Sequence, residues 1–318
     1  MLPFRPAPHR ARLLRLQLVC AALLLLVAVG AILGHGMRLA SGPAFFVLLG
    51  GLGASWACAA WRVRDLPLQD GALILLLVLG CLKAGALATY GVAPFARPLV
   101  DPALAGFDAA LGYHAPSVML WGQAHLDVLN ALGAIYNTFI PQFLLVVFLL
   151  AFVSRDLEAL WEYAFLLQGG VLAAVLLFAL FPAEGPQVYY GEGSLPHLEV
   201  FLEHFRALRA GTFETVHLDR LTGLVCVPSF HVFATVVNTY ALRRVRWAFP
   251  FVLALNVGMY AATLMVGGHY LADGAVSLLL FGALVLLYRR CFGASPAPAA
   301  PAAADATPPG DGEGDAVV

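Results

Sequence analysis

Long apolar runs dominate this sequence and restrict what the chain can fold into. A helix that crosses the hydrocarbon core of a bilayer needs about 20 mainly apolar residues. Eight such runs are spread along the 318 residues. Only 12% of the residues are Asp, Glu, Lys or Arg, against about 25% in a typical soluble domain. The sequence therefore excludes a soluble globular protein and predicts an all-α, polytopic membrane bundle.

The expected spans are apolar runs bounded by charged residues, glycine or proline. They cover residues 16–33, 43–61, 72–92, 132–153, 160–181, 228–242, 247–266 and 270–288. The first run follows four arginines, but it is longer than the apolar part of a signal peptide and lacks a clear A-x-A site, so we interpret it as a retained anchor. We divide the chain into N-terminal membrane helices (1–92), a catalytic membrane domain (93–290) and a disordered tail rich in Pro and Ala (291–318).

The arginines predict which side each loop faces, because basic loops stay in the cytoplasm. With the N-terminus inside, twelve arginines fall in inner segments and five in outer ones. The long connectors 93–131 and 182–227 then lie outside, and all histidines except His9 lie on or near that side. We expect the outer face to carry the chemistry. The richness in Ala, Leu and Arg suits a bacterial inner membrane, with the site facing the periplasm.

The two outer connectors differ from the inner loops in composition. Residues 107–133 mix apolar, aromatic and acidic side chains, which is typical of a helix at the membrane interface. Residues 196–210 predict a short amphipathic helix. The net charge of -1 leaves no electrostatic footprint for nucleic acid. The five cysteines form neither a disulfide framework nor a CxxC metal pair.

The first local motif is VPSFH, residues 227–231, at the outer start of the sixth span. Pro228 suits the first turn of a helix, which leaves the following amides free to face a ligand. His231 then lies about one turn inside the membrane. An ionisable side chain is costly there, so its presence favours a role in a functional site. An interfacial histidine hydrogen-bonded to a loop explains His231 equally well.

The second motif is GGHYLAD, residues 267–273, at the outer start of the eighth span. His269 and Asp273 are four residues apart and share a face on a helix. A carboxylate can hold one imidazole nitrogen protonated and leave the other free to attack, as in catalytic triads. Gly267 and Gly268 permit close approach of backbone or substrate. Alone, this spacing also fits an inert surface pair.

Topology joins the two motifs. Both begin helices on the outer side, so two helix N-termini with free amides would converge on one site that suits a phosphate.

These segments resemble a known family. LTGLVCVPSFH and MVGGHYLAD are similar to the second and third signature motifs, PSGH and SRxxxxxHxxxD, of the type 2 phosphatidic acid phosphatase (PAP2) superfamily. The closest likeness is to the branch of the inositol phosphorylceramide and sphingomyelin synthases. The resemblance covers roughly residues 101–290 and includes LGYH, YNTFIPQ and FPAEGP.

The resemblance implies a role for each motif residue. His269 would be the nucleophile that forms a phosphohistidine, Asp273 would orient it, and His231 would protonate the leaving oxygen. Two histidines with separate roles suffice without a metal or other cofactor. The resemblance implies a lipid phosphate or phospholipid as the partner, within the membrane.

The sequence differs from the family pattern at two places where the family carries basic residues. The arginine of the family pattern falls at Thr263, and the basic first motif has no clear counterpart in FPAEGPQVYY. We therefore name Ser229, Arg220, Gln187 and Gly268 as phosphate-binding candidates, together with helix amides. Arg206 and Arg209 are weaker candidates, because a solvent or headgroup contact explains them better.

The remaining polar residues have a structural interpretation. Lys83, inside the third span, would snorkel or pair within the bundle. Tyr136, Asn137 and Gln142 would either line the cavity or form interhelical hydrogen bonds. The histidines at 197, 204 and 217, with Glu203, match no compact metal-ligand pattern.

The sequence thus favours a membrane enzyme that cleaves a lipid phosphoester through a phosphohistidine, either as a phosphatase or as a phosphotransferase. The alternative is a transporter or scaffold with the same fold and no catalysis.

Overall fold

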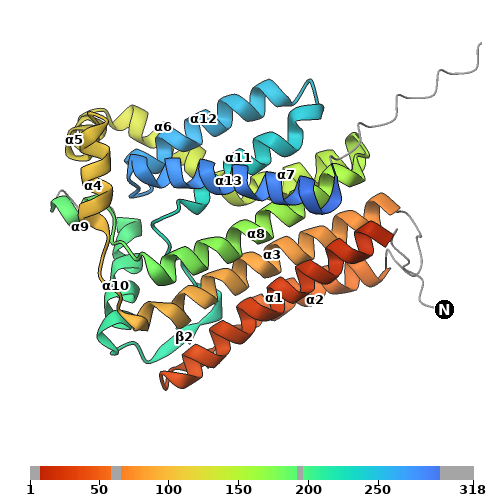
Figure 1. Ribbon diagram of the computed structural model, residues 1–318, viewed down its shortest axis with the longest axis horizontal. Helices are drawn as coiled ribbons and strands as arrows, with labels where there is room; N and C mark the ends of the chain where they lie inside the picture. The colour runs from red at the N-terminus through yellow and green to blue at the C-terminus, as the bar shows by residue number, and fades with distance from the viewer. Residues whose placement is uncertain (1–7, 59–65, 192–195, 294–318) are drawn as a thin grey trace, which may run out of the picture.

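The computed structural model describes residues 8–58, 66–191 and 196–293. It is a bundle of long helices, and short helices cover one of its ends (Figure 1). The first set of long helices contains α1 (Pro8–Gly34), α2 (Pro43–Cys58), α3 (Leu66–Val92) and α8 (Leu157–Leu180). Within this set α3 packs against the other three helices, and α1 also contacts α8.

The second set of helices carries both histidine motifs. It contains α6 (Leu126–Asn137), α7 (Phe139–Phe148) with a π-helical continuation at Leu149–Val153, α11 (Phe230–Ala241), α12 (Phe249–Met265) and α13 (Leu271–Phe292). The two sets meet where α8 packs against α11 and α13. The close approach of α8 to α11 requires a glycine at position 170, because a Cβ there would collide with the ring of the fully buried Phe233.

The two long connectors, 93–131 and 182–227, form much of the end of the bundle that lies on the left of Figure 1. The helices of this end are α4 (Asp101–Ala110), α5 (Ala115–Ala124), α9 (Pro186–Tyr190) and α10 (Pro196–Ala210). It also contains the short strands β1 (Arg38–Ala40) and β2 (Thr215–His217). One 3₁₀ turn, Ala93–Phe95, follows α3, and another, Leu218–Arg220, follows β2. The strands pair in parallel, with Leu39 opposite Val216. The amphipathic helix predicted at 196–210 is confirmed with those bounds. Residues 107–133, expected to form a helix at the membrane interface, are mostly helical but are divided among α4, α5 and α6.

All eight expected spans overlap helices, but the number of spans is not confirmed. Among the described residues, four helices (α1, α3, α8 and α13) are long and apolar enough to cross a membrane. The fourth expected span is broken between α6 and α7, which meet at 46° and would together add a fifth. The other three, α2, α11 and α12, have 16, 12 and 17 residues, so they fall below the roughly 20 that a straight span needs.

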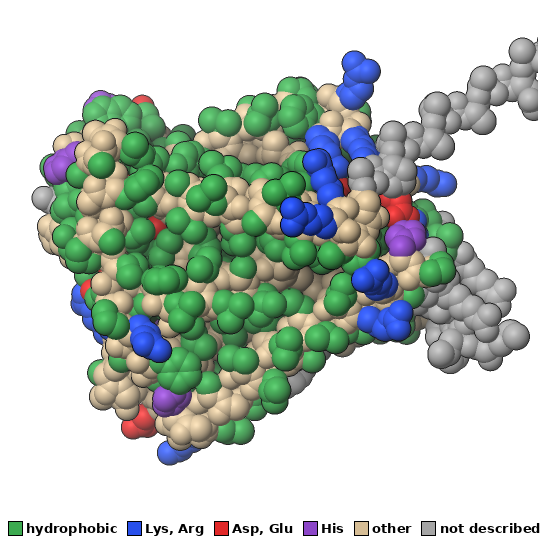
Figure 2. Space-filling model, viewed as in Figure 1, with side chains coloured by type: hydrophobic (Ala, Val, Ile, Leu, Met, Phe, Trp, Pro, Cys, Tyr) green, Lys and Arg blue, Asp and Glu red, His purple; other side chains and the backbone are tan. Residues whose placement is uncertain are grey.

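Ion pairs gather at the end of the bundle opposite α4 and α5. Arg10 at the start of α1 binds Asp70 at 2.9 Å and Glu158 at 2.5 Å, which joins the first turns of α3 and α8. Two further pairs, Arg243–Glu162 and Arg244–Asp156, join the 3₁₀ turn Leu242–Arg244, which follows α11, to the start of α8. Figure 2 shows Lys and Arg side chains concentrated at this end of the visible face. The arginines that the sequence assigns to the inner loops therefore gather at one end of the folded bundle.

The boundaries of the motif helices differ from the prediction. Helix α11 begins at Phe230, with Ser229 as its N-cap, so Pro228 precedes the helix and His231 lies in its first turn. Helix α13 begins at Leu271, so His269 precedes it. At the other end α13 continues to Phe292, two residues into the segment expected to be a tail. Residues 294–318 of that segment, and residues 59–61 of the second expected span, lie outside the described residues.

Candidate active site

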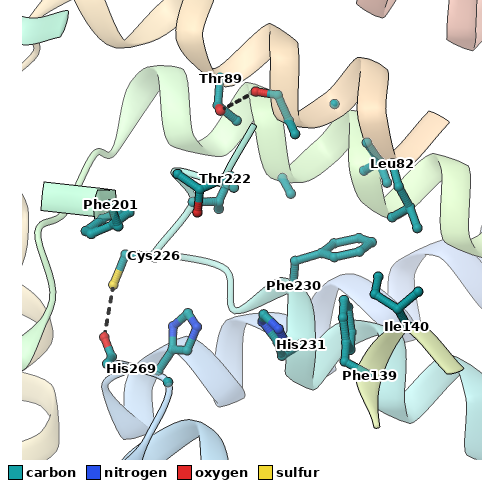
Figure 3. Close-up of a pocket in the computed structure, with 18 of the residues that line it drawn as sticks. Leu82, Thr89, Phe139, Ile140, Phe201, Thr222, Cys226, Phe230, His231 and His269 are labelled. Carbon is teal, nitrogen blue, oxygen red and sulfur yellow. Dashed lines mark hydrogen bonds between the residues drawn. The ribbon is translucent and has the colours of Figure 1, made fainter. Parts of the chain in front are cut away.

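A cavity of about 840 Å³ lies between the two sets of helices. Helix α3 contributes Leu82 and Thr89 to its wall, α7 contributes Ile140, and α10 contributes Phe201. The imidazoles of His231 and His269 and the Cys226 thiol also line it, and in Figure 3 Ile140 lies on the same side as His231, across the cavity from Leu82. The lining is mostly apolar, with a few polar groups, as in sites that bind small hydrophobic ligands.

His269 is held by the carboxylate of Asp273. Nδ1 of His269 lies 3.0 Å from Oδ2 of Asp273, and both side chains are buried. Since a carboxylate accepts hydrogen bonds, the hydrogen is on Nδ1, and Nε2 keeps its lone pair. The predicted contact is therefore present, although His269 lies in the turn before α13 and not on the helix.

Asp273 receives two further hydrogen bonds at the same oxygen. The Tyr270 amide donates to Oδ2 at 3.0 Å, and the Cys226 thiol donates at 3.3 Å. The Tyr270 bond caps the first turn of α13 and fixes the carboxylate beside His269. Sequence reasoning missed Cys226, although it lies only five residues before His231 in the same segment. Its apolar neighbours gave no sign of a polar contact.

His231 lies between two aromatic side chains. Its ring stacks on Tyr136, with centroids 4.5 Å apart, and lies 4.0 Å from the centroid of Phe139. The hydroxyl of Tyr136 is 3.4 Å from Nδ1 of His231. When this hydroxyl donates to Nδ1, Nε2 carries the ring hydrogen. The YNTFIPQ segment thus lines the site through Tyr136 and Phe139.

The two imidazoles face the same space. Their ring centroids are 6.3 Å apart and their planes differ by 55°. Both rings line the same cavity. Figure 3 shows both rings at the cavity wall formed by the α11 and α13 motifs.

The loop after α8 meets the turn that carries His269. Gly185 has a φ of 98°, and a Cβ there would lie 2.7 Å from the Gly268 carbonyl oxygen. Gln187 and Gly268 both line the cavity. The buried Nε2 of Gln187 has no hydrogen-bond partner among the described residues. Gln187, which directly follows the FPAEGP segment, therefore supplies a free amide donor at the wall of the site.

Two buried carboxylates of α4 hold these loops together. Asp101 accepts hydrogen bonds from the amides of Glu184 and Gly185 and from the Tyr270 hydroxyl, at 2.9 to 3.1 Å. Asp108 accepts from the Leu271 and Ala272 amides at the start of α13. Burial raises the pKa of the Asp108 carboxyl, and the two amide hydrogen bonds act in the opposite direction. Sequence reasoning did not single out either residue.

The phosphate-binding candidates from the sequence divide into two groups. Gln187 and Gly268 line the cavity. Ser229 instead uses its hydroxyl to accept from the Val232 amide as the N-cap of α11, and it is fully buried. Arg220 is exposed after β2 and is not among the cavity-lining residues. Thr263, at the position of the family's arginine, is buried and donates to the Tyr260 carbonyl.

The histidines outside the two motifs do not form a metal-ligand cluster in the described part of the chain. His204 binds the Tyr90 hydroxyl through Nδ1 at 2.7 Å, and burial lowers the pKa of its imidazole. The side chain of residue 197 lies outside the described set. Cys226, His269 and Asp273 do bring three possible ligand atoms within 4.8 Å. Oδ2 of Asp273 already accepts three hydrogen bonds, whereas its Oδ1 has no hydrogen-bond partner among the described residues.

Comparison with protein families gives one match, the PAP2 superfamily, over residues 102–287. This segment is more than half of the chain and contains both histidine motifs. The chain belongs to the PAP2 superfamily. Searches of curated proteins and of solved structures found no match.

Membership of the PAP2 superfamily fits the cavity and the helices. It supports a phosphatase-like lipid phosphoesterase, and the long apolar helices support an integral membrane protein. Helices α1 to α3 lie before the matched segment, yet α3 forms part of the cavity wall. Helix α3, which lies outside the matched segment, therefore contributes to the site.

Proposed function

We propose that this protein is a lipid phosphoesterase or phosphotransferase that works through a phosphohistidine on His269. The observation that carries the proposal is the pair of imidazoles, 6.3 Å apart at one apolar cavity, of which one is bound to a buried carboxylate. A lipid phosphate or phospholipid is the substrate, and its acyl chains lie along the apolar wall.

In the first step Nε2 of His269 attacks phosphorus. The P–N bond forms as the bond between phosphorus and the leaving oxygen breaks, and His231, which enters this step as the protonated imidazolium, gives its Nε2 proton to that oxygen and becomes neutral. Asp273 holds the Nδ1 hydrogen and stabilises the positive charge that develops on the ring, as in catalytic triads. Gln187 and the backbone at Gly268 offer neutral donors to the phosphoryl oxygens.

In the second step His231 takes a proton from the acceptor, whose oxygen then attacks phosphorus and breaks the P–N bond. Water as acceptor gives a phosphatase, whereas the hydroxyl of another molecule gives a transferase. The motif resemblance to the inositol phosphorylceramide and sphingomyelin synthases supports an alcohol acceptor such as inositol. Neither step requires a metal ion in this scheme.

The proposed location is a bacterial inner membrane with the cavity facing the periplasm. This orientation rests on the arginines at the end of the bundle opposite α4 and α5. The alternative of a catalytically inactive transporter or scaffold rests on the absence of the family's basic residues at Thr263 and in FPAEGPQVYY.

The test is turnover of defined lipids by the purified protein and its variants. Phosphatidic acid and a phosphodiester lipid are supplied with and without inositol, and both free phosphate and new lipids are quantified. We expect His269→Ala and His231→Ala to lower kcat by roughly 10³-fold or more, and Asp273→Asn to have a smaller effect. His125→Ala is the matched control, because His125 is exposed and stacks on Trp121 away from the cavity.

The inactive alternative gives the opposite result. If the wild-type protein released no phosphate and made no new lipid, or if both histidine variants kept full activity, the enzymatic proposal would be wrong.

A further inference from the structure

Lys83 is a cation at the wall of an apolar cavity. It lies on α3 at helical spacing from Leu79 and Ala86, and all three residues line the cavity. It is the only lysine of the chain. This position contrasts with that of the other basic residues, most of which the sequence places near the ends of the spans.

Lys83 has no ion-pair or hydrogen-bond partner among the described residues. Glu184 is another charged residue at the cavity wall, but it is bound by Arg206 at 2.9 Å. Asp70, at the start of α3, is bound by Arg10. An ammonium group in apolar surroundings is costly unless an anion compensates it. No such anion is present in the part of the protein that the structure describes.

The phosphate of a bound lipid would require a positively charged partner in this cavity. It is anionic and would be drawn out of water into a cavity with mainly apolar walls. The arginine candidate at 220 is exposed and away from the cavity wall, and Thr263 is neutral and buried. Figure 3 shows Leu82, the neighbour of Lys83, on the α3 side of the cavity that also contains His231. A lysine side chain is long and flexible, so its ammonium can move towards an anion.

We propose that Lys83 binds the negatively charged phosphate of the lipid substrate and is the main cationic contact of the cavity. This inference rests on the proposed function for the identity of the ligand. It assigns a binding role to α3, which lies outside the segment matched by the family. Lys83 therefore acts in recognition of anionic lipids, and His269, His231 and Asp273 act on the phosphorus.

The first test compares kinetics of charge-altering variants with phosphatidic acid. We expect Lys83→Gln to raise KM by about 10- to 100-fold, the range for loss of a charged hydrogen bond. Lys83→Arg keeps the charge and should stay within a few-fold of wild type. Arg38→Gln removes an exposed cation that does not line the cavity, and it should leave KM unchanged. An unchanged KM in Lys83→Gln would overturn the proposal.

The second test measures binding without turnover, in a His269→Ala background. Phosphatidic acid and diacylglycerol with the same acyl chains are titrated against this variant and against His269→Ala/Lys83→Gln. The affinity for phosphatidic acid should fall about 10- to 100-fold when Lys83 is replaced, and the affinity for diacylglycerol should not change. Equal losses for both lipids would indicate a packing defect and overturn the proposal.

The two tests separate the two proposals. If the wild-type protein binds phosphatidic acid through Lys83 but converts no lipid, the proposed function is wrong and the anion-binding role of Lys83 holds. If the protein converts lipid and Lys83→Gln binds it as tightly as wild type, the role of Lys83 is wrong and the proposed function holds.

Discussion

One oxygen of Asp273 accepts three hydrogen bonds, from the His269 ring, the Tyr270 amide and the Cys226 thiol. These donors come from the turn before α13 and from the segment before α11. The carboxylate is fully buried, so the donors and not water fix its position. Such a carboxylate can hold the His269 ring in one tautomer and one orientation throughout a reaction.

The sequence could predict the His269–Asp273 contact, because residues four apart at a helix start lie close together. It could not predict the contacts of Cys226, Tyr136 or Phe139. These depend on how α6, α7 and the segment 221–229 fold around the motif helices. Phosphate binding by Ser229 stays a prediction, and its role as the N-cap of α11 was a contact that the sequence did not predict.

The residue geometry makes a prediction about metals. In the proposed mechanism the two imidazoles perform both proton transfer and attack, so dialysis against EDTA should leave turnover within about two-fold of the untreated protein. The measurement is phosphate release or lipid formation before and after chelation. Loss of activity on chelation, with recovery on adding zinc, would instead assign Cys226, His269 and Asp273 as metal ligands.

At the scale of elements, α4 joins the active-site loops to one another. Its two buried carboxylates bind the start of α13, the Tyr270 hydroxyl and the loop after α8. The sequence predicted a helix in this connector and gave no reason to expect its acidic residues to turn inwards. Acidic side chains in an interfacial helix normally face water, and only the tertiary fold shows their backbone partners.

We predict that Asp108→Ala lowers both stability and activity. The change leaves the Leu271 and Ala272 amides without their acceptor, which should cost about 1 to 2 kcal/mol and loosen the turn that holds Asp273. Thermal unfolding in detergent and kcat/KM measure the two effects. Asp108→Asn keeps one acceptor oxygen, so its melting temperature and its kcat/KM should lie between those of the wild type and of Asp108→Ala. An Asp108→Ala protein with wild-type stability and activity would contradict this role for α4.

Two glycine-to-alanine variants, one at the contact and one as a control, test the packing of α8 against α11. Gly170→Ala places a Cβ against the buried ring of Phe233, and we expect it to destabilise the protein by about 1 to 3 kcal/mol. Gly80→Ala is the control, because no atom lies within 4 Å of the corresponding Cβ in α3. It should be neutral or slightly stabilising. Equal melting temperatures for the two variants would show that the contact does not constrain the bundle.

At the scale of the whole molecule, hydropathy predicted the helices better than the spans. Each apolar run overlaps a helix, yet the run at 132–153 is bent at Thr138, and α11 is short. Apolar composition is required both for contact with lipid and for burial inside a bundle. It therefore cannot separate a straight span from a broken one.

The distribution of charge predicts the orientation of the bundle. Basic ends remain in the cytoplasm, so the end that carries Arg243 and Arg289 should face inwards and α5 should face outwards. In a Cys58→Ser background, a membrane-impermeant maleimide should label Gln123→Cys on α5 in intact cells. It should label the exposed Cys291 only after permeabilisation. The reverse pattern would place the cavity on the cytoplasmic side.

The most direct measurement of the central claim is detection of the covalent intermediate. The protein is mixed with lipid substrate, quenched at alkaline pH to preserve phosphohistidine, digested and analysed by mass spectrometry. We predict phosphate on His269 in the wild-type protein and none in His269→Ala. Phosphate on another residue, or continued turnover by His269→Ala, would contradict the assignment of His269 as the nucleophile.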